Sequence, residues 1–122
     1  MIKWDDIKDK PSKIDKLITL CLFNPIGEDI EFDNRNSQFY TYYSQENERF
    51  YKVFPYSTNI ADAWEVVEKM CFNHWFEMNN NDTFKFIFHY YQLPEFNDYE
   101  AEESTAQLAI CHAALLAKGI IE

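Results

Sequence analysis

The chain has 122 residues, of which 47% are hydrophobic and 18% aromatic, and its formal net charge is −10 at pH 7. This length predicts a single domain over residues 1–122, and the hydrophobic fraction excludes a disordered chain. The acidic charge disfavours direct binding of nucleic acid or of an anionic membrane surface. The longest apolar runs are too short to span a bilayer, so we expect a soluble, cytoplasmic protein.

The N-terminal half predicts a helix, a hairpin and a second helix. Apolar residues recur at helical spacing over residues 12–24, directly after a proline. Residues 39–54 contain two aromatic-rich runs on either side of a polar turn, which predicts a hairpin. Residues 59–71 carry a second apolar helical stripe, with Thr58 or Asn59 as the cap.

The C-terminal half predicts a second hairpin and a third helix. Residues 74–78 and 83–91 are the expected strands, and aromatics at alternate positions give the second strand one apolar face. Residues 95–103 are expected to form an acidic loop. Ser104 and Gln107 match a capping box, and the helix that they open is apolar on most sides. We therefore expect it between the sheet and another helix, or at a homodimer interface. The fold class is α+β, with an antiparallel sheet of about four strands and three helices.

The cysteines and histidines are the first candidates for a metal site. Cys21, Cys71 and Cys111 all lie in apolar helical patterns, which predicts buried free thiols in a reducing cytosol. Cys71 is three residues from His74, and Cys111 adjoins His112, but a structural zinc site needs four convergent ligands. We expect no metal and no cofactor.

Catalytic motifs are also missing from the sequence pattern. The chain has two glycines, which excludes glycine-rich loops that cradle phosphates. Its serines lack the glycine context of an activated nucleophile, and its carboxylates gather in polar segments where nothing would raise their pKa. We expect that the protein is not an enzyme.

Three stretches of the sequence resemble a known family. They are SKIDKLITLCLFN (residues 12–24), PYSTNIADAWEVVEKM (55–70) and STAQLAICHAALLAKG (104–119). These are similar to the helices of the phage ABA sandwich domain family. The resemblance implies an α-β-α layered sandwich and a phage-encoded protein in the host cell. It supplies no catalytic residues, because the family has no established common chemistry.

The acidic segment after the second hairpin carries the candidate binding site. Its rings alternate with carboxylates, which suits a basic groove on a protein partner. The surplus of rings also implies that some aromatic side chains reach the surface. The candidate partner-binding residues are Glu95, Phe96, Asp98, Tyr99, Glu100, Glu102 and Glu103.

Charge, rings and resemblance together predict a non-catalytic phage accessory protein. It would bind and inhibit a host protein with a basic surface, such as a nuclease or defence effector, in the manner of an anti-CRISPR or similar counter-defence inhibitor. The binding would use an acidic, nucleic-acid-like surface.

Two alternative functions remain open. One is a small-molecule binder that sequesters a signalling nucleotide, for which Arg35 and Arg49 would have to converge on one pocket. Its stacking rings would be tyrosines such as Tyr40, Tyr42, Tyr43 or Tyr91. The other is a structural homodimeric phage protein that buries its last helix between two subunits.

Overall fold

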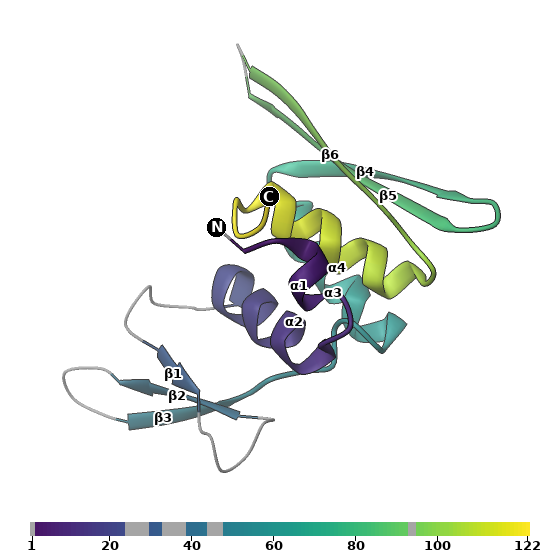
Figure 1. Cartoon of the computed structure of the whole chain (residues 1–122). Helices are drawn as coiled ribbons and strands as arrows, with labels where there is room; N and C mark the ends of the chain where they lie inside the picture. Colours follow the sequence, from purple (N-terminus) through teal and green to yellow (C-terminus); the bar gives the residue numbers. More distant parts are fainter. Residues whose placement is uncertain (1, 24–29, 33–38, 44–47, 93–94) are drawn as a thin grey trace.

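The computed structural model describes residues 2–23, 30–32, 39–43, 48–92 and 95–122 (Figure 1). Of residues 30–32, 39–43, 48–52, 91–92 and 95–96 it describes the backbone alone. Its elements, in chain order, are α1 (Trp4–Ile7), α2 (Pro11–Ile18), the π-helical segment η1 (Thr19–Phe23), β1 (Ile30–Phe32), β2 (Phe39–Tyr43), β3 (Glu48–Lys52), α3 (Ile60–Met70), β4 (His74–Asn80), β5 (Phe84–Gln92), β6 (Glu95–Glu103) and α4 (Ala106–Ala117).

The strands form two antiparallel sheets of three strands each, in the orders β1-β2-β3 and β4-β5-β6. The predicted α+β class is confirmed. Among the described residues six strands are present where about four were expected, because residues 30–32 and residues 95–103 also form strands. The segment predicted as an acidic loop is β6, which pairs with β5 along nine residues. That prediction was wrong because strand formation depends on cross-strand pairing and burial more than on the low β propensity of glutamate.

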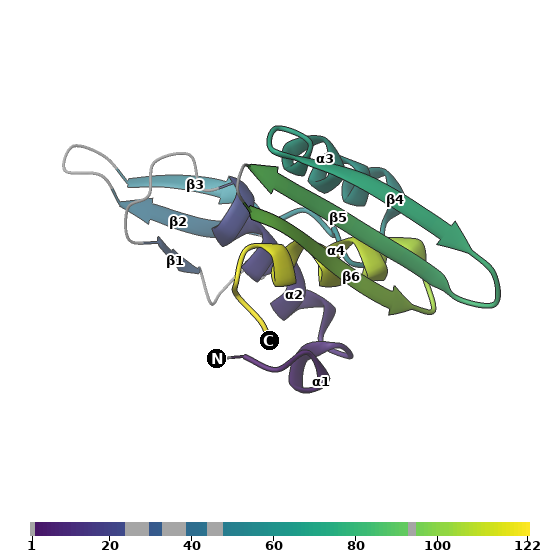
Figure 2. The same ribbon diagram turned by 90° about the horizontal axis from the view of Figure 1, so that it is seen from above.

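The helices lie on one face of the sheet β4–β6, and α4 is the central helix (Figures 1 and 2). One side of α4 packs on β5 and β6, and its other sides contact α2 and α3. Phe86 and Phe88 of β5 are fully buried at this layer, as the alternating aromatics predicted. The first of the two expected positions for the last helix, between the sheet and another helix, is therefore confirmed.

Small side chains allow α4 to occupy this central position. Ala109, Ala113 and Ala114 are fully buried, and so are Ile110 and Leu115. Alanine adds little bulk and has the highest helix propensity, so the sheet and the other helices approach the α4 backbone closely without destabilising the helix. No helix among the described residues is long and apolar enough to cross a membrane.

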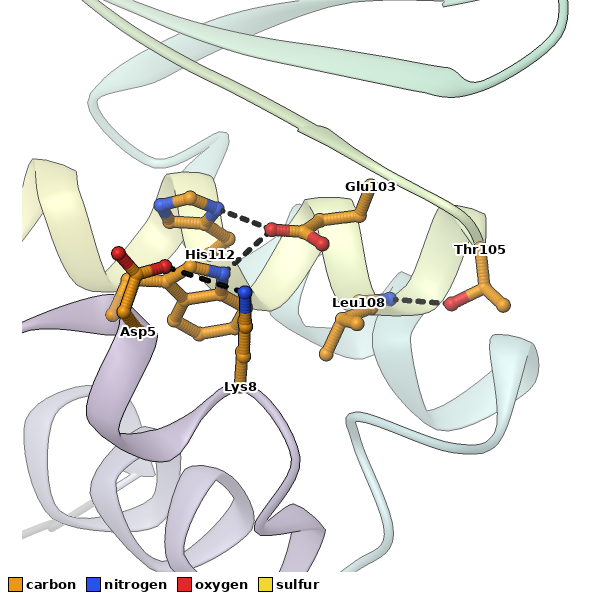
Figure 3. Close-up of polar contacts among 7 residues, drawn as sticks. Asp5, Lys8, Glu103, Thr105, Leu108 and His112 are labelled. Atoms are coloured by element: carbon orange, nitrogen blue, oxygen red, sulfur yellow. Dashed lines mark hydrogen bonds and ion pairs between the residues drawn. The ribbon is translucent and has the colours of Figure 1, made fainter.

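The start of α4 differs from the predicted capping box by one residue. The hydroxyl of Thr105, not of Ser104, accepts a hydrogen bond from the backbone N–H of Leu108 at 3.3 Å (Figure 3). The side chain of Gln107 donates to the carbonyl of Thr58 at 3.5 Å instead of turning back to the cap. It thus links α4 to the turn before α3.

One of the two caps proposed for α3 is confirmed. The side chain of Asn59 accepts a hydrogen bond from the N–H of Asp62 at 3.1 Å. The cap satisfies one of the backbone donors that every helix leaves free in its first turn.

A buried carboxylate joins α2 to the turn that leads into α3. Asp15 is 7% exposed, and its Oδ1 accepts the backbone N–H of Ser57 at 2.8 Å. The hydroxyl of Thr19 donates to the backbone carbonyl of Asp15 at 2.8 Å. Burial raises the pKa of the Asp15 carboxyl, and the Ser57 N–H opposes that rise.

The three cysteines are free thiols in three different environments. Cys111 is buried, as predicted, and Cys21 is half-buried. Cys71 is exposed, so the prediction that all three are buried was wrong for this residue. It follows the last residue of α3, at the C-cap, where the apolar stripe no longer faces the core.

Candidate protein-binding face

The sheet β4–β6 has one face covered by helices and one face that no described helix covers. Side chains alternate along each strand, and residues paired in register lie on the same face. Phe86 and Phe88 of β5 and Ala101 of β6 point toward the helices and are buried. The residues between them form the opposite side, which we call the open face: Trp75, Glu77, Asn79, Lys85, Ile87, His89, Asp98, Glu100 and Glu102.

The open face is acidic. Four carboxylates, from Glu77, Asp98, Glu100 and Glu102, share it with the single lysine Lys85. The side chains of Glu77, Asp98 and Glu100 remain 51%, 69% and 50% exposed. The Nζ of Lys85 lies 2.8 Å from Oε1 of Glu100, and this hydrogen bond raises the pKa of Lys85. One lysine cannot neutralise four carboxylates, so the open face has an excess of acidic groups over basic ones.

The ring of His89 lies on the central strand of the open face, between residues of β4 and β6. Its Nδ1 lies 2.6 Å from Oδ1 of Asp98, and its Nε2 lies 3.6 Å from Oε1 of Glu77. The indole of Trp75 stacks on the same imidazole, with ring centroids 3.9 Å apart and planes 19° from parallel. These contacts hold an aromatic surface beside two carboxylates from two different strands.

The structure divides the candidate binding residues between the two faces of β6. Asp98, Glu100 and Glu102 lie on the open face, in alternate positions about 7 Å apart along the strand. The side chains of Glu95 and Phe96 lie outside the described residues, although their backbone belongs to β6. The three open-face residues are the part of the predicted set that can meet one partner together.

Tyr99 and Glu103 lie on the helix-covered face and serve the interior. Tyr99 packs against the core, with its ring centroid 6.3 Å from that of His74. Glu103 accepts a hydrogen bond from Nε1 of Trp4 at 2.6 Å, and its Oε1 lies 2.9 Å from Nδ1 of His112 (Figure 3). Its side chain is 15% exposed, so it contributes little to the outer surface.

Trp4 and His112 enclose this carboxylate from the helical side. The two rings stack with centroids 4.1 Å apart and planes 9° from parallel. Burial lowers the pKa of His112, while the hydrogen bond to Glu103 opposes that change. The alternation of β6 therefore gives neighbouring glutamates opposite roles.

Trp75, Glu77 and His89 were not predicted from the sequence as members of this face. The alternation of residues 74–78 and 83–91 was visible in the sequence and assigns side chains to one face or the other. The pairing register, which brings Trp75 opposite His89 and His89 opposite Asp98, was not visible. Recognition of β6 as a third strand would have been the missing step.

The pairs considered as metal ligands do not form a cluster. Within the described ranges, no three His, Cys, Asp or Glu side chains are placed to hold a metal ion. The ring of His74 contacts the rings of Phe88 and Tyr90, and Cys111 is buried in α4. Burial raises the pKa of the Cys111 thiol well above its ordinary value, which keeps it protonated.

The described residues contain no site for the signalling nucleotide of the small-molecule alternative. The side chains of Arg35, Arg49 and the tyrosines at positions 40, 42, 43 and 91 lie outside the described residues. A hollow of about 470 Å³ lies beside α2, lined by Lys10, Ser12, Lys13, Lys16 and Leu17. No aromatic ring is among these lining residues, so the hollow lacks the stacking surface that this alternative requires.

Residues 14–115 match the family model described as Phage ABA sandwich domain. The matched stretch contains all of α3, residues 14–18 of α2 and residues 106–115 of α4, the three helices that carried the resemblance in the sequence. The chain matches no curated protein and no solved structure. The match covers most of the chain, and the chain therefore belongs to the phage ABA sandwich domain family.

Proposed function

We propose that this phage protein is a non-catalytic inhibitor that binds a basic surface of a host protein through its open face. The observation that carries the proposal is the unbalanced charge of that face, where four carboxylates and the stacked indole of Trp75 accompany a single lysine. A host nuclease or defence effector with a nucleic-acid groove has the complementary charge.

The geometry of the face suits a groove built for phosphates. Asp98, Glu100 and Glu102 form a row of anionic groups about 7 Å apart on a strand that is paired with β5 along its length. Lysine and arginine side chains that hold a nucleic-acid backbone can pair with such a row. Ile87 of β5 lies beside this row, and Trp75 lies one strand further, on β4. Both offer apolar contact, and a buried aromatic is the usual anchor of a protein interface.

The test compares retention of host proteins by the wild type and by two variants with equal loss of charge. The first variant, D98N/E100Q/E102Q, removes three carboxylates from the open face. The control, D6N/E65Q/E68Q, removes three exposed carboxylates from α1 and α3. Each protein is immobilised and exposed to host lysate at low salt, and bound proteins are eluted with high salt and identified.

The expected result is one basic host protein that the wild type and the control retain and the open-face variant loses. Once purified, that protein should bind a DNA oligonucleotide less tightly in the presence of the wild type, because both occupy the same groove. Equal retention by the two variants would contradict the proposal. If the wild type retains no basic protein, the proposal is contradicted and the nucleotide-binding and structural alternatives are favoured.

A further inference from the structure

The outer edge of β4 has no partner among the described strands. β4 and β6 are the two edge strands of their sheet, and β5 lies between them. An edge strand presents a row of unpaired backbone N–H and C=O groups, which can pair with another strand. The two edges of this sheet are protected from such pairing to very different degrees.

The difference lies in the charge of the two edge strands. β6 carries an acidic residue at five of its nine positions, and like charges keep another acidic chain away. β4, with the sequence HWFEMNN, has one acidic residue, Glu77. A chain with a net charge of −10 thus leaves one nearly uncharged edge open for pairing.

An apolar stripe follows this edge on the helix-covered side. Trp64 of α3 contacts Phe76 of β4 with ring centroids 5.7 Å apart. Ile60 precedes Trp64 by about one helical turn, and Met78 follows Phe76 by two strand residues. Each of these two spacings is about 6 Å along the edge, so Ile60 and Met78 extend the stripe in the same direction. These four side chains are 36% to 44% exposed.

We propose that β4 pairs with β4 of a second copy about a two-fold axis. The pairing would be antiparallel and would join the two sheets into one of six strands. A two-fold axis brings the same strand and the same apolar stripe from each copy together, so one surface serves as its own complement. This inference goes beyond the proposed function and does not depend on it.

The position of Glu77 selects the register. Glu77 is the central residue of β4, and a pairing centred on it would place two carboxylates opposite each other, which is unfavourable. A pairing centred on Phe76 places Phe76 opposite Phe76, Glu77 opposite Trp75 and Met78 opposite His74. Aromatic and apolar groups then meet across the axis, and no like charges are opposed.

The exposed area is of the size that a small dimer needs. The exposed fractions of the four stripe residues and Trp75 add up to about two complete side chains. At about 200 Å² for a large side chain, the exposed area is about 400 Å² per copy. A small stable interface buries about 600 Å² per partner. The main chain of β4 and its exposed polar residues can supply the remainder. The open faces of the two copies would then lie on one continuous surface.

Sedimentation equilibrium of the full chain over a range of concentrations tests the proposal. The wild type should reach twice the mass of one chain. M78K should weaken the dimer by about 30-fold or more, because it places a charge in the apolar seam. The matched control N97K puts the same charge on an exposed position of β6, the other edge strand, and should leave the dimer unchanged.

A disulfide cross-link tests the register independently of M78K. In a C71S background, which removes the exposed native thiol, F76C should form a covalent dimer under mild oxidation. W75C in the same background should not, because it would lie opposite Glu77. A wild type that stays monomeric at all concentrations would overturn the proposal and leave the edge for a segment of another protein. A dimer that M78K does not weaken would also overturn it.

Discussion

The Nε1 atom of Trp4 lies 2.6 Å from Oε1 of Glu103, so an indole near the N-terminus donates a hydrogen bond to the last residue of β6. The same oxygen lies 2.9 Å from Nδ1 of His112. One carboxylate therefore joins α1, the end of β6 and α4. The chain ends are held nearby, because Ile2 and Ile121 form a parallel bridge and the N–H of Glu122 donates to the carbonyl of Ile2.

Glu103→Ala should lower the free energy of unfolding by about 1–3 kcal/mol. The substitution leaves the half-buried donor of Trp4 without its acceptor, and an unsatisfied buried polar group costs about that amount. The matched control is Glu102→Ala, one residue away on the open face, which should change stability by about 0.5 kcal/mol or less. Urea unfolding measures both, and equal effects would contradict the assignment of the two glutamates to opposite faces.

Thr105→Ala should destabilise the protein by about 1 kcal/mol, because it removes the side-chain oxygen that caps α4. Ser104→Ala is the control and should have a smaller effect, since the cap bond comes from Thr105. Thermal unfolding of the two variants compares them directly. A larger loss for Ser104→Ala would instead favour the capping box expected from the sequence.

Asp15→Asn should change stability in a pH-dependent way. Burial raises the pKa of Asp15 above its ordinary value of 3.8, so ionisation of this carboxyl favours the unfolded state. This loss of stability is fully present when the pH is above the raised pKa of Asp15. It disappears as the pH falls through the raised pKa toward 3.8, because the carboxyl is then protonated in the folded state as well. The stability of Asp15→Asn relative to the wild type should therefore be greatest at neutral pH and decline as the pH falls.

Unfolding measurements from pH 7 downward can follow this difference. Asp6→Asn, which removes an exposed carboxylate from α1, is the control, and its difference from the wild type should change less over the same range. An Asp15→Asn difference that is constant with pH, or that grows as the pH falls, would contradict the predicted direction.

The three thiols should react with an alkylating reagent in the order of their exposure. Cys71 is exposed and should react first. Burial raises the pKa of Cys21 to about 11 and raises that of Cys111 well above its ordinary value, so few of these thiols are in the reactive thiolate form near neutral pH. Mass spectrometry of peptides after timed alkylation measures the order. Cys71→Ser should remove the fast phase, and rapid modification of Cys111 in the native protein would contradict its buried position.

The helices α2, α3 and α4 could be predicted from the sequence because their signals are local, whereas the four-residue α1 was not predicted. The apolar stripe of residues 59–71 repeats every one or two helical turns, and its cap, Asn59, directly precedes it. The structure places α3 over the same residues. The apolar character of residues 104–119 gave the central position of α4 as one of two expected positions. The alternating aromatics of residues 83–91 predicted the buried face of β5 in the same way.

The candidate site could be predicted only in part because its geometry depends on strand pairing. Asp98, Glu100 and Glu102 were found from their charge, but Trp75, Glu77 and His89 join them only through the register of β4 with β5 and of β5 with β6. Glu103 was grouped with the binding residues because its sequence neighbours are acidic. Its partners, Trp4 and His112, are distant in sequence and were not visible as contacts.

The central position of α4 has a consequence for the order in which the protein can fold during translation. α4 is the last of the described helices and strands in the chain, and β5, β6 and α2 all pack on it. During translation every other described element therefore leaves the ribosome before α4, the helix against which several of them pack. Until then the nascent chain exposes Phe86 and Phe88, so stalled or truncated products that lack α4 should be bound by chaperones or aggregate.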